Sequence, residues 1–178
     1  MIHQAARDMA VAQLGRAEWE ALAASRALTA QHFIGVEYYS DADTLALLEM
    51  IAARLGVGRD RAFFELGRHW IGFVAASPYA RMLRMAGDDL ESFLDNLDRM
   101  HASIKSNMPR AQMPTFHVVQ SRGGTIRVIY RSARSGLAPF VEGILSAVAE
   151  RFREAVTITS TPTEDGIMFE IRRVAADA

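Results

Sequence analysis

Apolar side chains recur at helical spacing through the first part of the chain, up to about Lys105. The sharpest case is the stretch 88–106, where five positions follow one another at intervals of four, three, four and three residues. These positions are Leu90, Leu94, Leu97, His101 and Ile104. Such intervals place side chains on one face of an α-helix. Comparable patterns predict further helices that open at Asp43 and cover residues 60–76 and 79–85.

After Asn107 the apolar and polar residues alternate with a period of two, which is the spacing of a β-strand. The turn residues Ser121-Arg122-Gly123-Gly124 separate two such stretches and predict a β-hairpin. A second hairpin is expected to turn through residues 162–166, and a helix over residues 138–155 is expected between the hairpins. The predicted strands are residues 115–120, 125–130, 156–160 and 167–174.

The two patterns together predict an α+β fold. A helical part over residues 1–106 is followed by an antiparallel sheet with one inserted helix over residues 107–178. No repeat, low-complexity tract or linker divides the chain, and 178 residues is an ordinary length for one domain. We therefore expect a single domain over residues 1–178.

Composition narrows the classes of function. The residues are 50% hydrophobic and 23% charged, which is typical of a folded chain. The formal net charge of −1 gives no overall attraction to nucleic acid or to an anionic membrane, so neither is expected as a partner. The lack of cysteine excludes disulfides, thiolate metal sites and cysteine nucleophiles. No leader or spanning segment is visible, which predicts a cytoplasmic protein.

Motifs of hydrolysis and group transfer are missing, since the sequence contains no Walker loop, no HExxH and no GxSxG. The chain also ends at Ala178 without a recognisable catalytic domain. We therefore expect a protein that is not an enzyme by itself.

His101 is the histidine whose position suggests chemistry, because it lies in the apolar stripe of the helix predicted over residues 88–106. A buried neutral imidazole has two ring nitrogens that need partners. One interpretation is a core histidine that bonds a backbone carbonyl. The other is an axial ligand to a flat apolar cofactor, with the leucines of the stripe packed on its ring. Position alone leaves both open.

The segment Tyr130-Arg131-Ser132-Ala133-Arg134 contains a second polar constellation. If the strand continues this far, Tyr130, Ser132 and Arg134 share one face, because strand side chains alternate. That face suits a ligand with an apolar body and an anionic end, since a guanidinium pairs with carboxylates. The alternative is a strand that leaves the core for solvent near Gly136.

Together these residues resemble the H-NOX (heme nitric oxide/oxygen-binding) family, which includes the heme domain of soluble guanylate cyclase and bacterial stand-alone proteins. Tyr130-x-Ser132-x-Arg134 begins 29 residues after His101, which is similar to the family's spacing. Residues 93–101 resemble its proximal helix, and Met113-Pro114-Thr115-Phe116 resembles the segment whose proline presses on the heme ring. The resemblance spans nearly the whole chain.

The resemblance implies a heme b (iron protoporphyrin IX) held between the helical part and the sheet. It implies His101 as the iron ligand and Pro114 as a residue that distorts the porphyrin. The propionates would be held by Tyr130, Ser132 and Arg134. The remaining contacts would come from Leu97, Ile104, Phe140, Trp70 and Val74.

The function that this resemblance implies is a heme-based gas sensor, which binds nitric oxide and carbon monoxide at ferrous heme. The signal would pass in trans to a separate effector, either a histidine kinase or a cyclic-di-GMP enzyme. Nitric oxide would weaken the bond between histidine and iron and let the helix and the ring relax. Two alternatives stay open: an oxygen-binding or redox heme protein, and a heme-free protein-interaction module.

The sequence departs from oxygen-binding members of the family on the distal side. Those members carry a tyrosine where this chain has Pro139-Phe140-Val141, which offers no hydroxyl. Trp70 stands where such members can carry an asparagine, and it could simply fill the pocket. His3 stands near a usually aliphatic position and could approach the iron, although a surface or disordered placement is the expectation. We therefore expect no stable oxygen complex.

Overall fold

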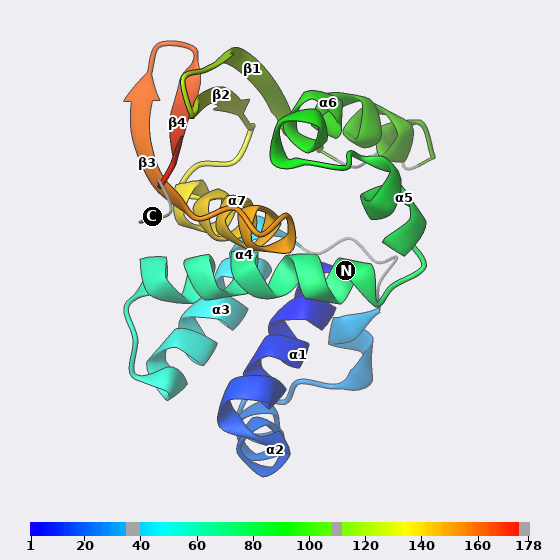
Figure 1. Ribbon diagram of the computed structural model, residues 1–178. Coiled ribbons are helices and arrows are strands. Elements are labelled where there is room, and N and C mark those ends of the chain that lie inside the picture. The colour runs from blue at the N-terminus through cyan, green and yellow to red at the C-terminus, as the bar shows by residue number, and fades with distance from the viewer. Residues whose placement is uncertain (35–39, 108–111, 175–178) are drawn as a thin grey trace.

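The computed structural model describes residues 1–34, 40–107 and 112–174 (Figure 1). From the N-terminus to Asn107 the described elements are helices. Their bounds are α1 Ile2–Leu14, α2 Arg16–Ser25, the short 3₁₀ helix Ala30–Phe33, α3 Asp41–Leu55, α4 Arg59–Ala75, α5 Ala80–Met85 and α6 Leu90–Asn107. None of the described helices is both long and apolar enough to cross a membrane.

An antiparallel sheet in the order β1-β2-β4-β3 follows the helices. Its strands are β1 Thr115–Arg122, β2 Thr125–Arg131, β3 Val156–Thr163 and β4 Gly166–Arg173, and α7 Ala138–Arg151 connects β2 to β3. The register of β1 against β2 shifts between Val118 and Gln120, as at a β-bulge. The predicted α+β fold is confirmed. In Figure 1 the sheet and α6 lie on one side of α7, and α1, α2 and α3 lie on the other side, beyond α4.

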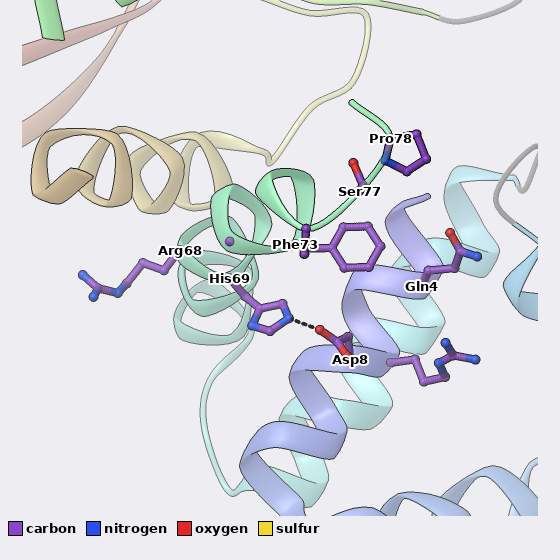
Figure 2. Close-up of a pocket in the computed structure, with 10 residues that line it drawn as sticks. Gln4, Asp8, Arg68, His69, Phe73, Ser77 and Pro78 are labelled. Carbon is purple, nitrogen blue, oxygen red and sulfur yellow. Dashed lines mark hydrogen bonds and ion pairs between the residues drawn. The ribbon is translucent and has the colours of Figure 1, made fainter. Parts of the chain in front are cut away.

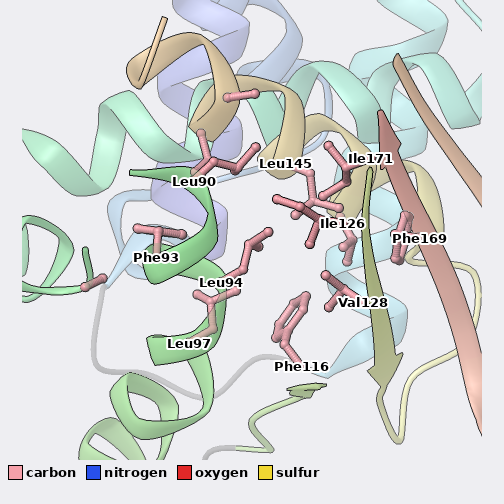
Figure 3. Packing of buried hydrophobic residues seen from close by; sticks show 14 of the residues in the cluster. Leu90, Phe93, Leu94, Leu97, Phe116, Ile126, Val128, Leu145, Phe169 and Ile171 are labelled. Atoms are coloured by element: carbon pink, nitrogen blue, oxygen red, sulfur yellow. The ribbon is translucent and has the colours of Figure 1, made fainter. Parts of the chain in front are cut away.

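The apolar stripe of α6 faces the sheet, as its spacing predicts. Leu90, Leu94 and Leu97 are buried, while His101 and Ile104 further along the same face are only half-buried. Figure 3 shows the buried side chains of α6 pointing toward apolar side chains of β2, β4 and α7. The facing residues are Ile126, Val128, Leu145, Phe169 and Ile171. The stripe therefore fastens α6 at its start and leaves its end nearer the surface.

Buried apolar side chains form two clusters. The sheet cluster joins α6, α7 and the strands, and it includes Leu97, Phe116 and Tyr130. The helical cluster joins α1, α3 and α4, and it includes Met9 and Ile51. Trp70 on α4 packs against both clusters. The helix α4 is therefore shared between the two halves of the core.

Close backbone contact joins α4 to α7. A methyl group on Gly67 would lie 2.9 Å from the Ile144 nitrogen, and one on Gly143 would lie 3.0 Å from the Arg68 nitrogen. Arg68 adds a two-pronged ion pair to Glu150 on α7, with N–O distances of 2.5 and 2.9 Å. Each helix thus presents a glycine to the other's backbone, and any larger side chain there forces the helices apart.

Two predicted boundaries are wrong. The helix α7 ends at Arg151 rather than at residue 155, because Arg153 adopts a left-handed φ of 60° that turns the chain toward the sheet. β3 continues through Pro162 to Thr163, so the turn contains only Glu164-Asp165. β3 is an outer strand of the sheet, where a proline need not remove a ladder hydrogen bond.

Candidate functional site

His101 lies near the end of α6 with a half-buried side chain. Its Nδ1 is 3.1 Å from the carbonyl oxygen of Pro114. A carbonyl only accepts, so Nδ1 carries the proton and donates it, and Nε2 keeps a lone pair. Burial lowers the pKa of His101, and the Pro114 contact and the Asp98 charge only partly oppose this. Among the described residues no hydrogen bond engages Nε2, so the ring is a neutral imidazole with one nitrogen available to a ligand.

Asp98 fixes the surroundings of His101, and the sequence analysis missed it. Its Oδ1 accepts from the Phe116 backbone nitrogen at 2.6 Å, which ties α6 to the start of β1. The Phe116 ring lies 5.6 Å from the His101 ring. The available signal was the spacing, because a carboxylate three residues before a histidine lies on the same helix face. Together with Pro114, this contact sets where the imidazole lies relative to the sheet.

Tyr130, Ser132 and Arg134 come together, but not by strand alternation. β2 ends at Arg131, close to the predicted end at Tyr130, so the condition that the strand continues through Arg134 is not met. A turn follows, in which the Ser132 hydroxyl accepts from the Arg134 backbone N–H at 3.0 Å. Burial raises the pKa of Tyr130, while a hydrogen bond from the Ser132 side chain and the Arg134 charge lower it. The phenol, hydroxyl and guanidinium therefore share one neighbourhood at the end of β2.

The Arg134 guanidinium also holds distant segments of the chain. Its Nε donates to Asp41 Oδ1 at 2.6 Å, and a terminal nitrogen donates to the Gln112 carbonyl at 3.2 Å. Asp41 lies in the first turn of α3, where a carboxylate also suits the helix dipole. The sequence analysis did not identify the pairing of Asp41 with Arg134, because the two residues are 93 positions apart. Because both side chains are more than one-third exposed, the contact is adjustable rather than locked.

Some of the residues predicted to make apolar contacts with the cofactor lie close together, and others do not. Leu97 is buried in the sheet cluster, and Val74 and Trp70 pack against that cluster from α4. The Trp70 ring stacks on Phe73 at 6.1 Å and meets the edge of Phe140 at 6.2 Å. Phe140 packs against the helical cluster. Ile104 is half-buried beyond both clusters, so the structure does not bring it together with the others.

His3 is placed differently from the expectation. It lies in α1, is only 4% exposed, and is neither at the surface nor in a disordered stretch. Its Nδ1 is 3.0 Å from the His32 carbonyl oxygen and its Nε2 is 3.0 Å from the Thr44 hydroxyl. Burial lowers the pKa of His3. With both ring nitrogens engaged, the side chain is a structural link between α1 and α3.

An open pocket of about 640 Å³ lies between α1 and α4 (Figure 2). Charged side chains gather on it, and His69 Nε2 is 2.9 Å from Asp8 Oδ2 across the two helices. Phe73 contributes a ring to its lining and stacks on Trp70 behind it. None of the residues predicted to bind a cofactor lines this pocket.

The known proteins that match this chain in sequence include soluble guanylate cyclases. The worm protein "Soluble guanylate cyclase gcy-35" of Caenorhabditis elegans is 29% identical over 164 residues, which cover 88% of this chain but 23% of the relative. "Guanylate cyclase soluble subunit beta-2" of Rattus norvegicus is 36% identical over 86 residues, covering 48% and 13% of the two chains. The chain thus spans less than a quarter of the length of these relatives.

Solved structures share the fold. An H-NOX protein from S. oneidensis in the Fe(II) state superposes with a TM-score of 0.84 at 20% identity, covering 99% of this chain and 96% of that one. An oxygen-binding H-NOX domain related to soluble guanylate cyclases gives a TM-score of 0.78 at 16% identity, covering 95% and 91%. The profile of the Haem-NO-binding family matches residues 1–160. The chain therefore belongs to the Haem-NO-binding (H-NOX) family, whose domains are heme-based gas sensors.

Proposed function

We propose that this protein senses nitric oxide, with carbon monoxide as a second ligand, at a ferrous heme b. The observation that carries the proposal is the 3.1 Å contact from His101 Nδ1 to the Pro114 carbonyl. It selects the tautomer in which Nε2 keeps its lone pair, and metals bind neutral imidazole through such a nitrogen. Ferrous heme would supply an open coordination position for a diatomic gas.

The residues around His101 fit a heme. The sheet cluster offers apolar side chains such as Leu97 and Val74, and the end of β2 offers a phenol, a hydroxyl and a guanidinium. Heme has the matching chemistry, with an apolar ring and carboxylates at one edge. We assign His101 to the iron and Pro114 to the ring face. The proposed propionate partners are Tyr130, Ser132 and Arg134, and the further apolar contacts are Ile104, Phe140 and Trp70.

The choice of gas follows from donors on the distal side. Oxygen is polarised when it binds ferrous iron, and a positioned hydrogen-bond donor stabilises it by about 1.5 to 3 kcal/mol. Phe140 and Val141 carry no side-chain donor. His3 is engaged by His32 and Thr44, which removes one of the two donors left open by the sequence. Because Phe140 and Val141 offer no donor and His3 is engaged, we propose that oxygen is not held stably. The Trp70 indole N–H is the donor to replace if a stable oxygen complex forms.

The signal would leave the site through α6. His101 and Asp98 both tie this helix to the segment that opens β1. If the proposed bond between His101 and iron weakened, the buried leucines and Asp98 would still hold α6 in place. The end of the helix, where His101 lies, would be free to shift. The proposed receiver is a separate histidine kinase or cyclic-di-GMP enzyme. The cytoplasmic location and the single domain over residues 1–178 stay predictions.

Absorption spectra of the ferrous protein test the proposal. We expect a five-coordinate spectrum without gas, a shift with nitric oxide or carbon monoxide, and only slow oxidation in air. A split six-coordinate spectrum in air would replace the proposal with an oxygen-binding protein. A six-coordinate spectrum without gas would indicate a redox heme protein. A colourless preparation after expression with added heme would indicate a protein-interaction module.

Replacement of His101 by glycine tests the iron ligand directly. We expect H101G to lose heme, or to retain it only with added imidazole, which can occupy the vacated space. His117→Gly is the matched control, because His117 is exposed on β1. A normal five-coordinate ferrous spectrum of H101G without imidazole would refute the assignment.

A further inference from the structure

A groove lined with methionine lies between α5 and α6, which neighbour each other in Figure 1. It has a volume of about 330 Å³, and its lining residues are Met82, Met85, Asn96, Arg99, Met100 and Ser103. Met85 is 71% exposed, more than any other exposed large hydrophobic residue in the described part of the chain. Methionine is unbranched and flexible, so surfaces rich in it adapt to apolar side chains of a partner.

Exposed arginines lie on both helices that form this groove. Arg99 lines it, and Arg81 and Arg84 accompany Met82 and Met85 on α5; all three arginines are exposed. Among the described residues none of the three has an ion-pair partner. Of the carboxylates near Arg99 on α6, Asp98 accepts from the Phe116 backbone N–H, and Asp95, one turn before Arg99, forms no ion pair with any described residue. The groove thus combines adaptable methionine side chains with one arginine in its lining and two more exposed arginines on the same helix as Met82 and Met85.

The two walls of the groove share buried contacts in the sheet cluster but have different backbone neighbours. α5 packs against α4, whereas α6 packs against β1. Met100, on the α6 wall, immediately precedes His101. A shift of the end of α6 relative to α4 would therefore change the width of the groove.

We propose that this groove docks an acidic amphipathic helix of the effector protein. Leucine or methionine side chains spaced by three and four residues would enter the groove, and flanking Asp or Glu residues would pair with Arg81, Arg84 and Arg99. A phosphodiester backbone offers nothing for the methionine floor, and a flat membrane surface does not enter a concave groove. The dependence of docking on gas rests on the proposed function, while docking itself does not.

A labelled peptide tests the proposal with the heme-loaded protein. The probe is a fluorescein-labelled helix of about five turns with glutamates beside a leucine stripe. We expect saturable binding by fluorescence anisotropy, with an affinity that differs between the gas-free and nitric oxide states. A peptide with lysine at every glutamate position should not bind. Equal binding of both peptides, or stronger binding of anionic vesicles or duplex DNA than of the acidic peptide, would overturn the proposal.

Charge reversal locates the site. The double variant R84E/R99E should weaken peptide binding by about tenfold or more, because it places like charges against the peptide. Arg122→Glu is the matched control, since Arg122 is an exposed arginine on the β1–β2 hairpin, and it should bind normally. Absorption spectra of each variant report heme and gas binding separately. Loss of peptide binding in R122E as well, or none in R84E/R99E, would refute the groove while leaving the gas-sensing proposal intact.

Discussion

Replacement of Gly67 by alanine should separate α4 from α7. The new Cβ would lie 2.9 Å from the Ile144 nitrogen and 3.0 Å from the Phe140 carbonyl carbon, and it would overlap the Phe140 oxygen. Carbon contacts are optimal at about 3.5 to 4.0 Å, so relief of the carbon contact alone requires the helices to part by roughly 0.5 to 1 Å, and relief of the oxygen overlap requires more. A gap of that size forfeits about a quarter to a half of each dispersion contact.

The expected change in stability follows from two opposing effects. Overpacking of this kind costs about 1 to 3 kcal/mol, and the clash with rigid backbone favours the upper end. Alanine gains about 1 kcal/mol over glycine in helix propensity. We therefore expect G67A to unfold with a free energy about 1 to 2 kcal/mol lower than the wild type. G143A, the reciprocal change, should behave in the same way, because it meets the backbone of Phe64 and Arg68.

Gly72 supplies the control in the same helix. It is exposed, and outside its immediate neighbours and the backbone of its own helix no atom lies within 4 Å of its added Cβ, so G72A should stabilise the protein by about 0.5 to 1 kcal/mol. Urea unfolding followed by circular dichroism, at matched heme occupancy, measures both variants. At about 2 to 4 °C per kcal/mol for a chain of this length, the thermal midpoint should fall by about 2 to 8 °C in G67A and rise by about 1 to 4 °C in G72A. If G67A is as stable as G72A, the close approach of α4 and α7 is not what holds them.

Three further outcomes are expected. Arg134→Ala should speed transfer of heme to an apo-globin acceptor by roughly tenfold, since one charge-assisted contact at a partly exposed site is lost; an unchanged rate contradicts the propionate assignment. Asp98→Ala leaves the Phe116 backbone N–H without its partner and should cost about 1 to 3 kcal/mol in urea unfolding, whereas Asp98→Asn should cost less. Equal losses would count against the hydrogen bond. Burial holds the pKa of His3 below 6.5, so the unfolded chain binds a proton there before the folded one does, and stability should fall as the pH drops below about 6.5. His3→Gln should show a shallower pH dependence, and parallel curves would refute this.

The fold was predictable where one periodicity dominates. The leucine stripe of α6 buries its first three members against the sheet, because helix spacing and core position agree there. The end of α7 was not predictable, because it depends on the left-handed backbone conformation of Arg153. Arginine rarely adopts this conformation. The extent of β3 depends on its place at the sheet edge, which makes Pro162 harmless. Edge position is a property of the assembled sheet and is invisible along the strand.

The candidate site was predictable in its residues more than in its contacts. His101 and the Tyr130–Arg134 segment lie in recognisable patterns, but the Arg134 partners Asp41 and Gln112 are brought in by the tertiary fold. Asp41 and Arg134 are 93 positions apart in the chain, and no local pattern predicts that pair. The expected surface or disordered placement of His3 was wrong for a related reason. A polar residue near a terminus is expected at the surface, yet two specific partners compensate its burial in α1.

The outer strands of the sheet have a consequence for chains that are newly made or have lost part of their structure. An exposed strand edge can recruit a strand from another copy and so seed aggregation. Pro162 interrupts the row of backbone donors along β3, and the register shift between Val118 and Gln120 interrupts the regular spacing of β1. Both outer strands are thus poor templates for edge-to-edge growth, which protects the protein while its apolar clusters are still incomplete.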